Sequence, residues 1–94
     1  MYFLDVKITS FNCEVGLLVA RGMDWKWGRQ DFSPITGKQA NGTVRKCLPN
    51  MEAWVHWADG GKKRYYRIGA ENAFDLVLVS GTFLNPINLK QFEV

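Results

Sequence analysis

The stretch RGMDWKWGRQD, residues 21–31, carries the most information about the fold. It holds two tryptophans one residue apart, Trp25 and Trp27, together with two glycines and the carboxylates Asp24 and Asp31. It contains no candidate enzyme nucleophile, no cluster of metal ligands and no phosphate-binding loop. Large aromatic side chains at this density in a small chain indicate either an unusual core or a recognition surface.

The segments around this stretch show the alternation and glycine punctuation of short strands. A short apolar run at residues 17–21 leads into it, and a long connection at residues 22–41, rich in Gly, Ser, Pro, Asn and Gln, contains the rest of it. Because long connections in compact domains are usually functional, this loop is the first place to look for a binding surface. Other strands are expected at residues 42–47, 53–57, 63–68 and 75–79, and residues 2–8 are expected to form a strand or an ordered arm.

The pattern contains no convincing amphipathic helix, so it predicts an all-β fold. We expect a small SH3-like barrel of about five short strands with a long early loop. Alternation along the third strand places Val55 and Trp57 on one face, and Trp54 and His56 on the other. The sequence DGG at residues 59–61 is a strong hairpin signal.

Length and composition indicate one small globular domain. The 94 residues can bury a modest core without obligatory cross-links. Four Trp, six Phe and three Tyr are many for this length, and such rings let a small fold bury a large area from few positions. The net charge of +3 is too mild to point to nucleic acid or to a membrane as the partner.

The two cysteines, Cys13 and Cys47, lie far apart in the chain, and His56 is the only histidine. A structural zinc site needs about four ligands, so we expect neither a metal nor another cofactor. We expect two free, buried thiols, and a disulfide is the alternative. The N-terminus lacks the features of a signal peptide, and no apolar stretch approaches the ~20 residues of a membrane span. The chain is therefore expected in the cytoplasm or the nucleus.

Taken together, these residues resemble a Mib-Herc domain, a module named after the Mind bomb ubiquitin ligases and a giant HECT-type ligase. The family pattern runs G-x-x-V-x-R-G-x-D-W-x-W-x-x-Q-D-G, then G-x-V, then V-x-W-D-x-G, then Y-R-x-G, and finally D-L. Order and spacing agree over residues 16–76. The matching residues are Gly16, Val19, Arg21, Gly22, Asp24, Trp25, Trp27, Gln30, Asp31, Gly42, Val44, Val55, Trp57, Asp59, Gly60 or Gly61, Tyr66, Arg67, Gly69, Asp75 and Leu76.

The sequence departs from the family pattern at three places. Phe32 stands where the family favours glycine, Ala58 lengthens the hairpin by one residue, and the loop at residues 33–41 is longer than in many members. The extra hairpin residue predicts a bulge.

The resemblance implies a non-catalytic recognition module inside a much larger E3 ubiquitin ligase. In Mind bomb proteins such domains take part in recognising the cytoplasmic tails of Notch ligands. The partner expected here is a protein or peptide, either a ubiquitination substrate or a ligase subunit. The chain then divides into an N-terminal extension at residues 1–15, the barrel at residues 16–79, and a C-terminal extension at residues 80–94 that packs on the barrel.

The predicted binding residues lie at the end of the first apolar run, on the long loop and on the fourth predicted strand: Trp25, Trp27, Asp24, Asp31, Arg21 and Tyr65. The other motif residues are assigned structural roles: Gly22, Gln30, Trp57, Tyr66, Arg67, Gly69 and Asp75. A structural alternative exists for the first group as well. At least one tryptophan would then anchor the core, the aspartates would bond their own backbone, and Arg67 would pair with Asp24 or Asp31 and fasten the loop.

Three other functions compete with peptide recognition. A chromatin-type reader would enclose a methylated lysine between Trp25, Trp27, Trp57 and a tyrosine by cation–π attraction. A single-strand nucleic-acid binder would combine basic residues with stacked rings. A structural spacer would bury all four tryptophans and expose no groove. The sequence offers no nucleophile–base pair for an enzyme.

Overall fold

The computed structural model describes residues 2–79 of the chain. Its elements, in chain order, are β1 (Tyr2–Lys7), β2 (Leu18–Arg21), β3 (Gly42–Leu48), β4 (Glu52–Trp57), the 3-10 turn η1 (Ala58–Gly60), β5 (Lys63–Arg67), the 3-10 turn η2 (Ala70–Asn72) and β6 (Leu76–Val79). The strands predicted at residues 17–21, 42–47, 53–57, 63–68 and 75–79 are thus present to within one residue or so at each end. The predicted C-terminal extension lies outside the described residues.

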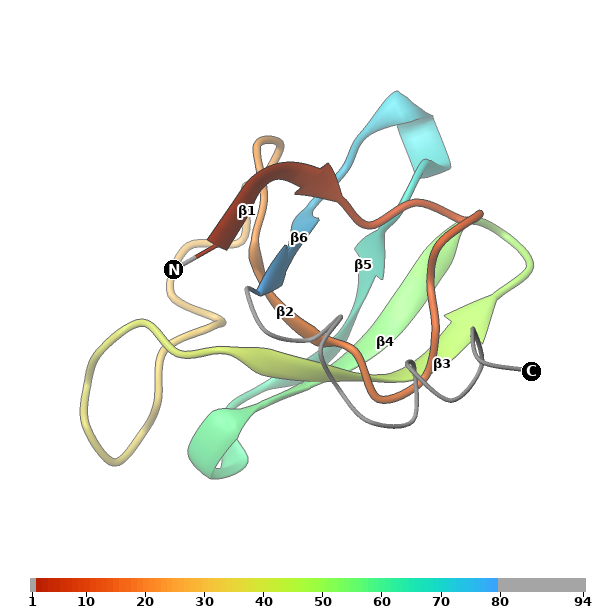
Figure 1. Ribbon diagram of the computed structural model, residues 1–94. Helices are drawn as coiled ribbons and strands as arrows, with labels where there is room; N and C mark the ends of the chain where they lie inside the picture. Colours follow the sequence, from red (N-terminus) through yellow and green to blue (C-terminus); the bar gives the residue numbers. More distant parts are fainter. Residues whose placement is uncertain (1, 80–94) are drawn as a thin grey trace, which may run out of the picture.

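All six strands belong to one antiparallel sheet in the order β1-β6-β2-β3-β4-β5, which curls around its concave face (Figure 1). The predicted all-β class is confirmed. The sheet differs from the predicted barrel because its edge strands, β1 and β5, share no ladder in the described part of the chain. A single antiparallel bridge between Ile68 and Phe74 joins the chain after β5 to the chain before β6. The sheet is therefore curled but open.

Strand β1 comes from the segment that precedes the family match, and it pairs with β6. In this ladder Lys7 pairs with Val77. Just after β1, the backbone N–H of Ile8 donates to the carbonyl of Leu76 at 2.9 Å, and the Ile8 side chain is buried. The sheet thus extends to one side of the region that the motif covers.

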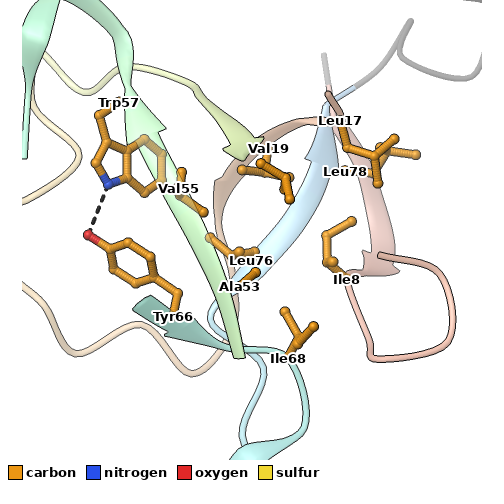
Figure 2. Packing of buried hydrophobic residues seen from close by; sticks show 11 residues of the cluster. Ile8, Leu17, Val19, Ala53, Val55, Trp57, Tyr66, Ile68, Leu76 and Leu78 are labelled. Atoms are coloured by element: carbon orange, nitrogen blue, oxygen red, sulfur yellow. Dashed lines mark hydrogen bonds between the residues drawn. The ribbon is translucent and has the colours of Figure 1, made fainter. Parts of the chain in front are cut away.

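The core follows the strand alternation, as in β4, where every second side chain is buried. Val55 and Trp57 point inward and Trp54 and His56 outward, as predicted. Figure 2 shows Trp57 and Tyr66 packed at one end of the apolar cluster and Ile8, Leu17 and Leu78 at the other. The buried apolar residues of the cluster are Ile8, Leu17, Val19, Val44, Ala53, Val55, Trp57, Tyr66, Ile68, Leu76 and Leu78.

Gly22 lets the end of β2 approach the beginning of β6. Its N–H donates to the carbonyl of Asp75 at 2.6 Å. A Cβ atom at this position would lie 2.8 Å from the backbone nitrogen of Leu76, closer than a side chain tolerates. Glycine is therefore required here for close backbone approach, and the approach places the double-tryptophan loop directly beside Asp75.

The two cysteines form a disulfide, so the expectation of free thiols is wrong. The chain before β2 runs antiparallel to β3, because the N–H of Gly16 donates to the carbonyl of Val44 and the N–H of Val44 to that of Leu17. This pairing brings Cys13 opposite Cys47, with their Cα atoms 6.2 Å apart. Their separation of 34 residues hid the proximity in the sequence.

Within the described residues, no helix has the length and apolar character that a bilayer crossing requires.

Candidate functional site

Asp75 is the anchor of the double-tryptophan loop. Its carboxylate is fully buried and accepts hydrogen bonds from the indole Nε1 of Trp27 at 3.0 Å and from the backbone N–H of Arg67 at 2.8 Å. The guanidinium of Arg67 adds two more, from Nε at 3.0 Å and from Nη2 at 2.8 Å. One buried carboxylate therefore fastens the loop to the end of β5.

Burial by itself would raise the pKa of Asp75. The hydrogen bonds from the side chain and backbone of Arg67 and from Trp27, with the nearby positive charge, outweigh this effect and leave the pKa of Asp75 below its usual value. The same carboxylate raises the pKa of Arg67. The pair is thus ionised across the physiological range.

The carboxylate partner of Arg67 differs from the one predicted from the sequence. Its carboxylate partners are Asp75 and, at 3.4 Å, the exposed Glu71, instead of Asp24 or Asp31. Its Nη2 nevertheless donates to the backbone carbonyl of Asp24 at 3.0 Å. The predicted fastening of the loop by Arg67 is present, although it acts through a backbone oxygen.

The two aspartates of the motif are both engaged inside the molecule. Asp31 is fully buried and receives a bidentate pair from Arg21, with Nε donating to Oδ2 at 2.7 Å and Nη2 to Oδ1 at 2.6 Å. This hydrogen-bonded contact raises the pKa of Arg21. Asp24 accepts the backbone N–H of Phe74 at 2.7 Å. These carboxylates are already satisfied by the protein's own donors.

Four rings of the motif pack against one another. Trp25 stacks on Tyr66 with ring centroids 5.1 Å apart, and Trp57 meets the same tyrosine edge-on at 5.6 Å. Trp27 contacts it edge-on at 6.2 Å. Because the buried Tyr66 ring occupies the space between them, these rings do not enclose the open cage that a methyl-lysine reader requires.

A chain of hydrogen bonds holds this aromatic cluster in place. The indole Nε1 of Trp57 donates to the hydroxyl of Tyr66 at 2.9 Å, and that hydroxyl donates to Oε1 of Gln30 at 2.9 Å (the first bond is drawn in Figure 2). Burial raises the pKa of Tyr66. The indole of Trp25 donates to the carbonyl of Gly28 at 2.9 Å.

Beside the cluster, a pocket of about 450 Å³ opens to the surface. Its aromatic walls are Trp27, Trp54 and Tyr65, and its charged rim is formed by Lys26, Glu52, Arg64, Arg67 and Glu71. Trp54 and Tyr65 are direct partners across β4 and β5, with ring centroids 4.5 Å apart. The guanidinium of Arg64 lies 4.0 Å from the centroid of Trp27. We call this hollow the aromatic pocket.

The structure separates the predicted binding residues into two groups. Trp27 and Tyr65 line the aromatic pocket, and Tyr65 is 44% exposed. Arg21, Asp24, Trp25 and Asp31 do not line it and belong to the internal network described above. Sequence reasoning missed Trp54, although an aromatic residue on the polar face of a strand was an available signal.

A family model and several known proteins match this chain. The family model described as Mib_herc2 matches residues 16–80. E3 ubiquitin-protein ligase MIB2 of Gallus gallus is 39% identical over 74 residues, which are 71% of this chain and 7% of that protein. E3 ubiquitin-protein ligase Ufd4 of Drosophila melanogaster is 36% identical over 87 residues, which are 93% of this chain and 3% of that protein.

E3 ubiquitin-protein ligase HERC2 of Mus musculus is 38% identical over 68 residues, covering 70% of this chain and 1% of that protein. The chain therefore spans only a small part of the length of these relatives. The matched region includes the network around Asp75 and Asp31 and the loop that it fastens, and on this match the chain belongs to the Mib_herc2 family.

Proposed function

We propose that this chain is a non-catalytic protein- or peptide-recognition domain of a large E3 ubiquitin ligase, and that it recruits a substrate or partner through the aromatic pocket. The observation that carries this proposal is the location of Trp27, Trp54 and Tyr65 around one open hollow with a charged rim. Aromatic side chains in such hollows supply much of the binding energy of protein interfaces.

The relatives support the ligase context, because those named above are E3 ubiquitin-protein ligases of which this chain matches 1% to 7%. The internal network supports a non-catalytic role. Its two buried carboxylates, Asp31 and Asp75, are each paired with an arginine and do not line the pocket, whereas a general acid or base must reach its substrate. The partner is accordingly a protein or peptide.

A selection from a displayed random-peptide library tests this proposal. The bait is the folded chain, and the matched control bait is Trp54→Ala, which removes one wall of the pocket and leaves the buried network untouched. We expect peptides that are enriched by the wild type and lost with the variant. An isolated pocket of this size should bind at micromolar or weaker Kd, with avidity in the parent protein adding to it.

An NMR titration with a selected peptide then maps the site. The indole N–H signal of Trp54 and the ring C–H signals of Trp27 and Tyr65 should shift, whereas the indole N–H signal of Trp57, which is buried and bonded to Tyr66, should not. If no peptide is enriched over Trp54→Ala, or if the shifts fall on a different face, the proposed pocket is wrong and a purely structural domain becomes the better explanation.

A further inference from the structure

We propose that the partner segment is acidic, with one large apolar side chain in the aromatic pocket and flanking carboxylates held by Arg45 and Lys46 of β3. This inference rests on the proposed function and specifies the chemistry of the ligand. It is drawn from a second hollow next to the first, from a bulge that shapes it, and from the charges around both.

A hollow of about 340 Å³ lies next to the aromatic pocket and shares two of its walls, Trp54 and Tyr65. Its remaining lining is Arg45, Lys46 and His56. Among residues 2–79, no carboxylate contributes to this lining. We call it the basic hollow. A peptide that places a side chain against Trp54 and Tyr65 can therefore contact both hollows.

A bulge in β3 brings two neighbouring cations to the same side of the sheet. Val44 pairs with Val55, and Lys46 pairs with Trp54, so the register shifts at Arg45. Simple alternation after the buried Val44 would direct Lys46 inward. The extra residue reverses the phase, and both Arg45 and Lys46 are exposed. Bulges of this kind commonly re-aim side chains at binding sites.

The strand pairing also aligns the two hollows. Lys46 is the partner of Trp54 across β3 and β4, and Trp54 is the partner of Tyr65 across β4 and β5. The three side chains therefore form one row across the outer face of the sheet. A positive charge stands at one end of this row and two rings follow it, which suits a ligand with an anionic end and an apolar end.

The charge balance around the two hollows favours an anionic ligand. Five lysine and arginine side chains line the two hollows, against two carboxylates, Glu52 and Glu71, of which Glu71 pairs with Arg67. Within the described residues, by contrast, no ion pair engages the four remaining cations of the two hollows, which are Lys26, Arg45, Lys46 and Arg64. Carboxylates of a partner would complement these cations.

An acidic peptide fits this surface better than a nucleic acid does. Glu52 and Glu71 both line the aromatic pocket, so a continuous phosphate backbone across the two hollows would meet two carboxylates. A peptide can place its charge at the basic hollow alone and an uncharged side chain between Trp54 and Tyr65. The modest net charge of +3 is in keeping with a local charge pattern.

The test compares two double variants with the same net charge. Arg45→Gln/Lys46→Gln removes the cations of the basic hollow, and Lys38→Gln/Lys62→Gln removes two exposed cations that line neither hollow. Both are used, with the wild type, as baits for the displayed peptide library. We expect wild-type peptides that combine a large apolar residue with several Asp or Glu residues.

The Kd of a selected peptide should rise about tenfold or more in Arg45→Gln/Lys46→Gln, which corresponds to roughly 1.4 kcal/mol, and less than about twofold in the control. Binding should weaken as ionic strength rises.

Selected peptides that are neutral or basic would overturn this inference, and so would equal Kd values in the two variants. Either result would leave the proposed function standing. A short single-stranded oligonucleotide that displaces the peptide at equal concentration would also overturn this inference. If the wild type enriches no peptide relative to Trp54→Ala, both this inference and the proposed function are wrong.

Discussion

The carboxylate of Asp75 joins groups that lie 48 and 8 residues away from it in the chain, the indole of Trp27 and the guanidinium of Arg67. A fully buried charge is tolerated because four donors surround it. The same residue determines where the loop sits, so it positions Trp27 as a wall of the aromatic pocket.

Replacement of Asp75 by asparagine should strongly destabilise the fold. The Asp75→Asn change keeps the size of the side chain but leaves the guanidinium of Arg67, whose side chain is only 11% exposed, without its main counter-charge. Breaking a buried pair in this way costs roughly 3–5 kcal/mol. The free energy of unfolding in guanidinium chloride measures the loss.

Glu71→Gln is the matched control for this change. Glu71 pairs with the same arginine, but its side chain is 73% exposed and the distance is 3.4 Å. Exposed pairs contribute about 1 kcal/mol or less, so this variant should be nearly as stable as the wild type. Equal losses in the two variants would show that Asp75 is not the anchor.

At this scale the sequence identified the motif residues but could not assign their partners. The resemblance assigned Gln30, Tyr66, Arg67 and Asp75 to structure, and their contacts fit such roles. The predicted carboxylate partner of Arg67 was wrong, because charge alone does not distinguish Asp24, Asp31 and Asp75 as partners. The pairing of the chain after β5 with the chain before β6 brings Asp75 beside it, since the N–H of Asp75 donates to the carbonyl of Arg67 at 2.9 Å.

Among the secondary-structure elements, the contact between the end of β2 and the start of β6 depends on Gly22. A Gly22→Ala change puts a methyl group 2.8 Å from the backbone of Leu76, and backbone atoms of a paired strand cannot move aside easily. We expect a loss of about 3 kcal/mol or more, seen as a lower thermal midpoint and as shifted amide signals of residues 74–76.

Gly37→Ala serves as the control for glycine replacement. Gly37 has a φ of 70°, and nothing in the described part of the chain lies within 4 Å of the methyl group that alanine would add, so only backbone strain opposes the change. Such strain costs roughly 1–2 kcal/mol. A Gly22→Ala variant as stable as Gly37→Ala would contradict the tight approach of β2 and β6.

The disulfide between Cys13 and Cys47 links the segment before β2 to β3. Cross-linking residues 34 apart should stabilise the fold by about 2–4 kcal/mol, mainly by restricting the unfolded chain. A Cys13→Ser/Cys47→Ser variant should therefore melt at a lower temperature than the wild type. Addition of a reductant should lower the wild-type midpoint to a similar value and leave the variant unchanged.

Thiol alkylation followed by mass spectrometry provides the independent check on this bond. The unreduced, unfolded wild type should take up no alkylating groups and the reduced protein two. Uptake of two groups without reductant would contradict the disulfide.

The strands were predictable because alternation and glycine positions mark them directly in the sequence. The bulge in β3 was not, since Arg45 and Lys46 are both polar and give no sign of which face each one takes. The disulfide also escaped prediction, because it depends on pairing between segments far apart in the chain.

For the molecule as a whole, two buried groups set the limits of stability against pH. The pKa of Asp75 is lowered in the folded state, so its contribution is present above the unfolded carboxyl pKa of about 4 and is lost as pH falls through the folded value. The pKa of Tyr66 is raised by burial, so its contribution is present below about 10 and is lost as pH rises through the folded value.

The free energy of unfolding should accordingly form a plateau across neutral pH with a fall on each side. Denaturant titrations across pH measure this curve. In Asp75→Asn the free energy of unfolding should fall less steeply at acid pH than in the wild type. In Tyr66→Phe it should fall less steeply at alkaline pH. Each fall is measured from that variant's own value at neutral pH. Curves of the variants that run parallel to the wild type would show that other groups control the pH dependence.

The overall architecture was predictable as a class, and its open edge was not. Sequence patterns identify strands but not whether the two edge strands of the sheet, here β1 and β5, meet, which depends on how far the sheet curls. The aromatic pocket was found in part, through Trp27 and Tyr65. Trp54 remained hidden because it lies outside the family motif, and only the pairing of β4 with β5 brings it beside Tyr65.

The row of Lys46, Trp54 and Tyr65 has a consequence for protein engineering. These three side chains project from the outer face and take no part in the hydrogen-bond network around Asp75 and Asp31. A designer could therefore randomise the row to create new binding specificities on an unchanged scaffold. Trp27 offers no such freedom, because replacing its indole would alter the recognition surface and the loop anchor together.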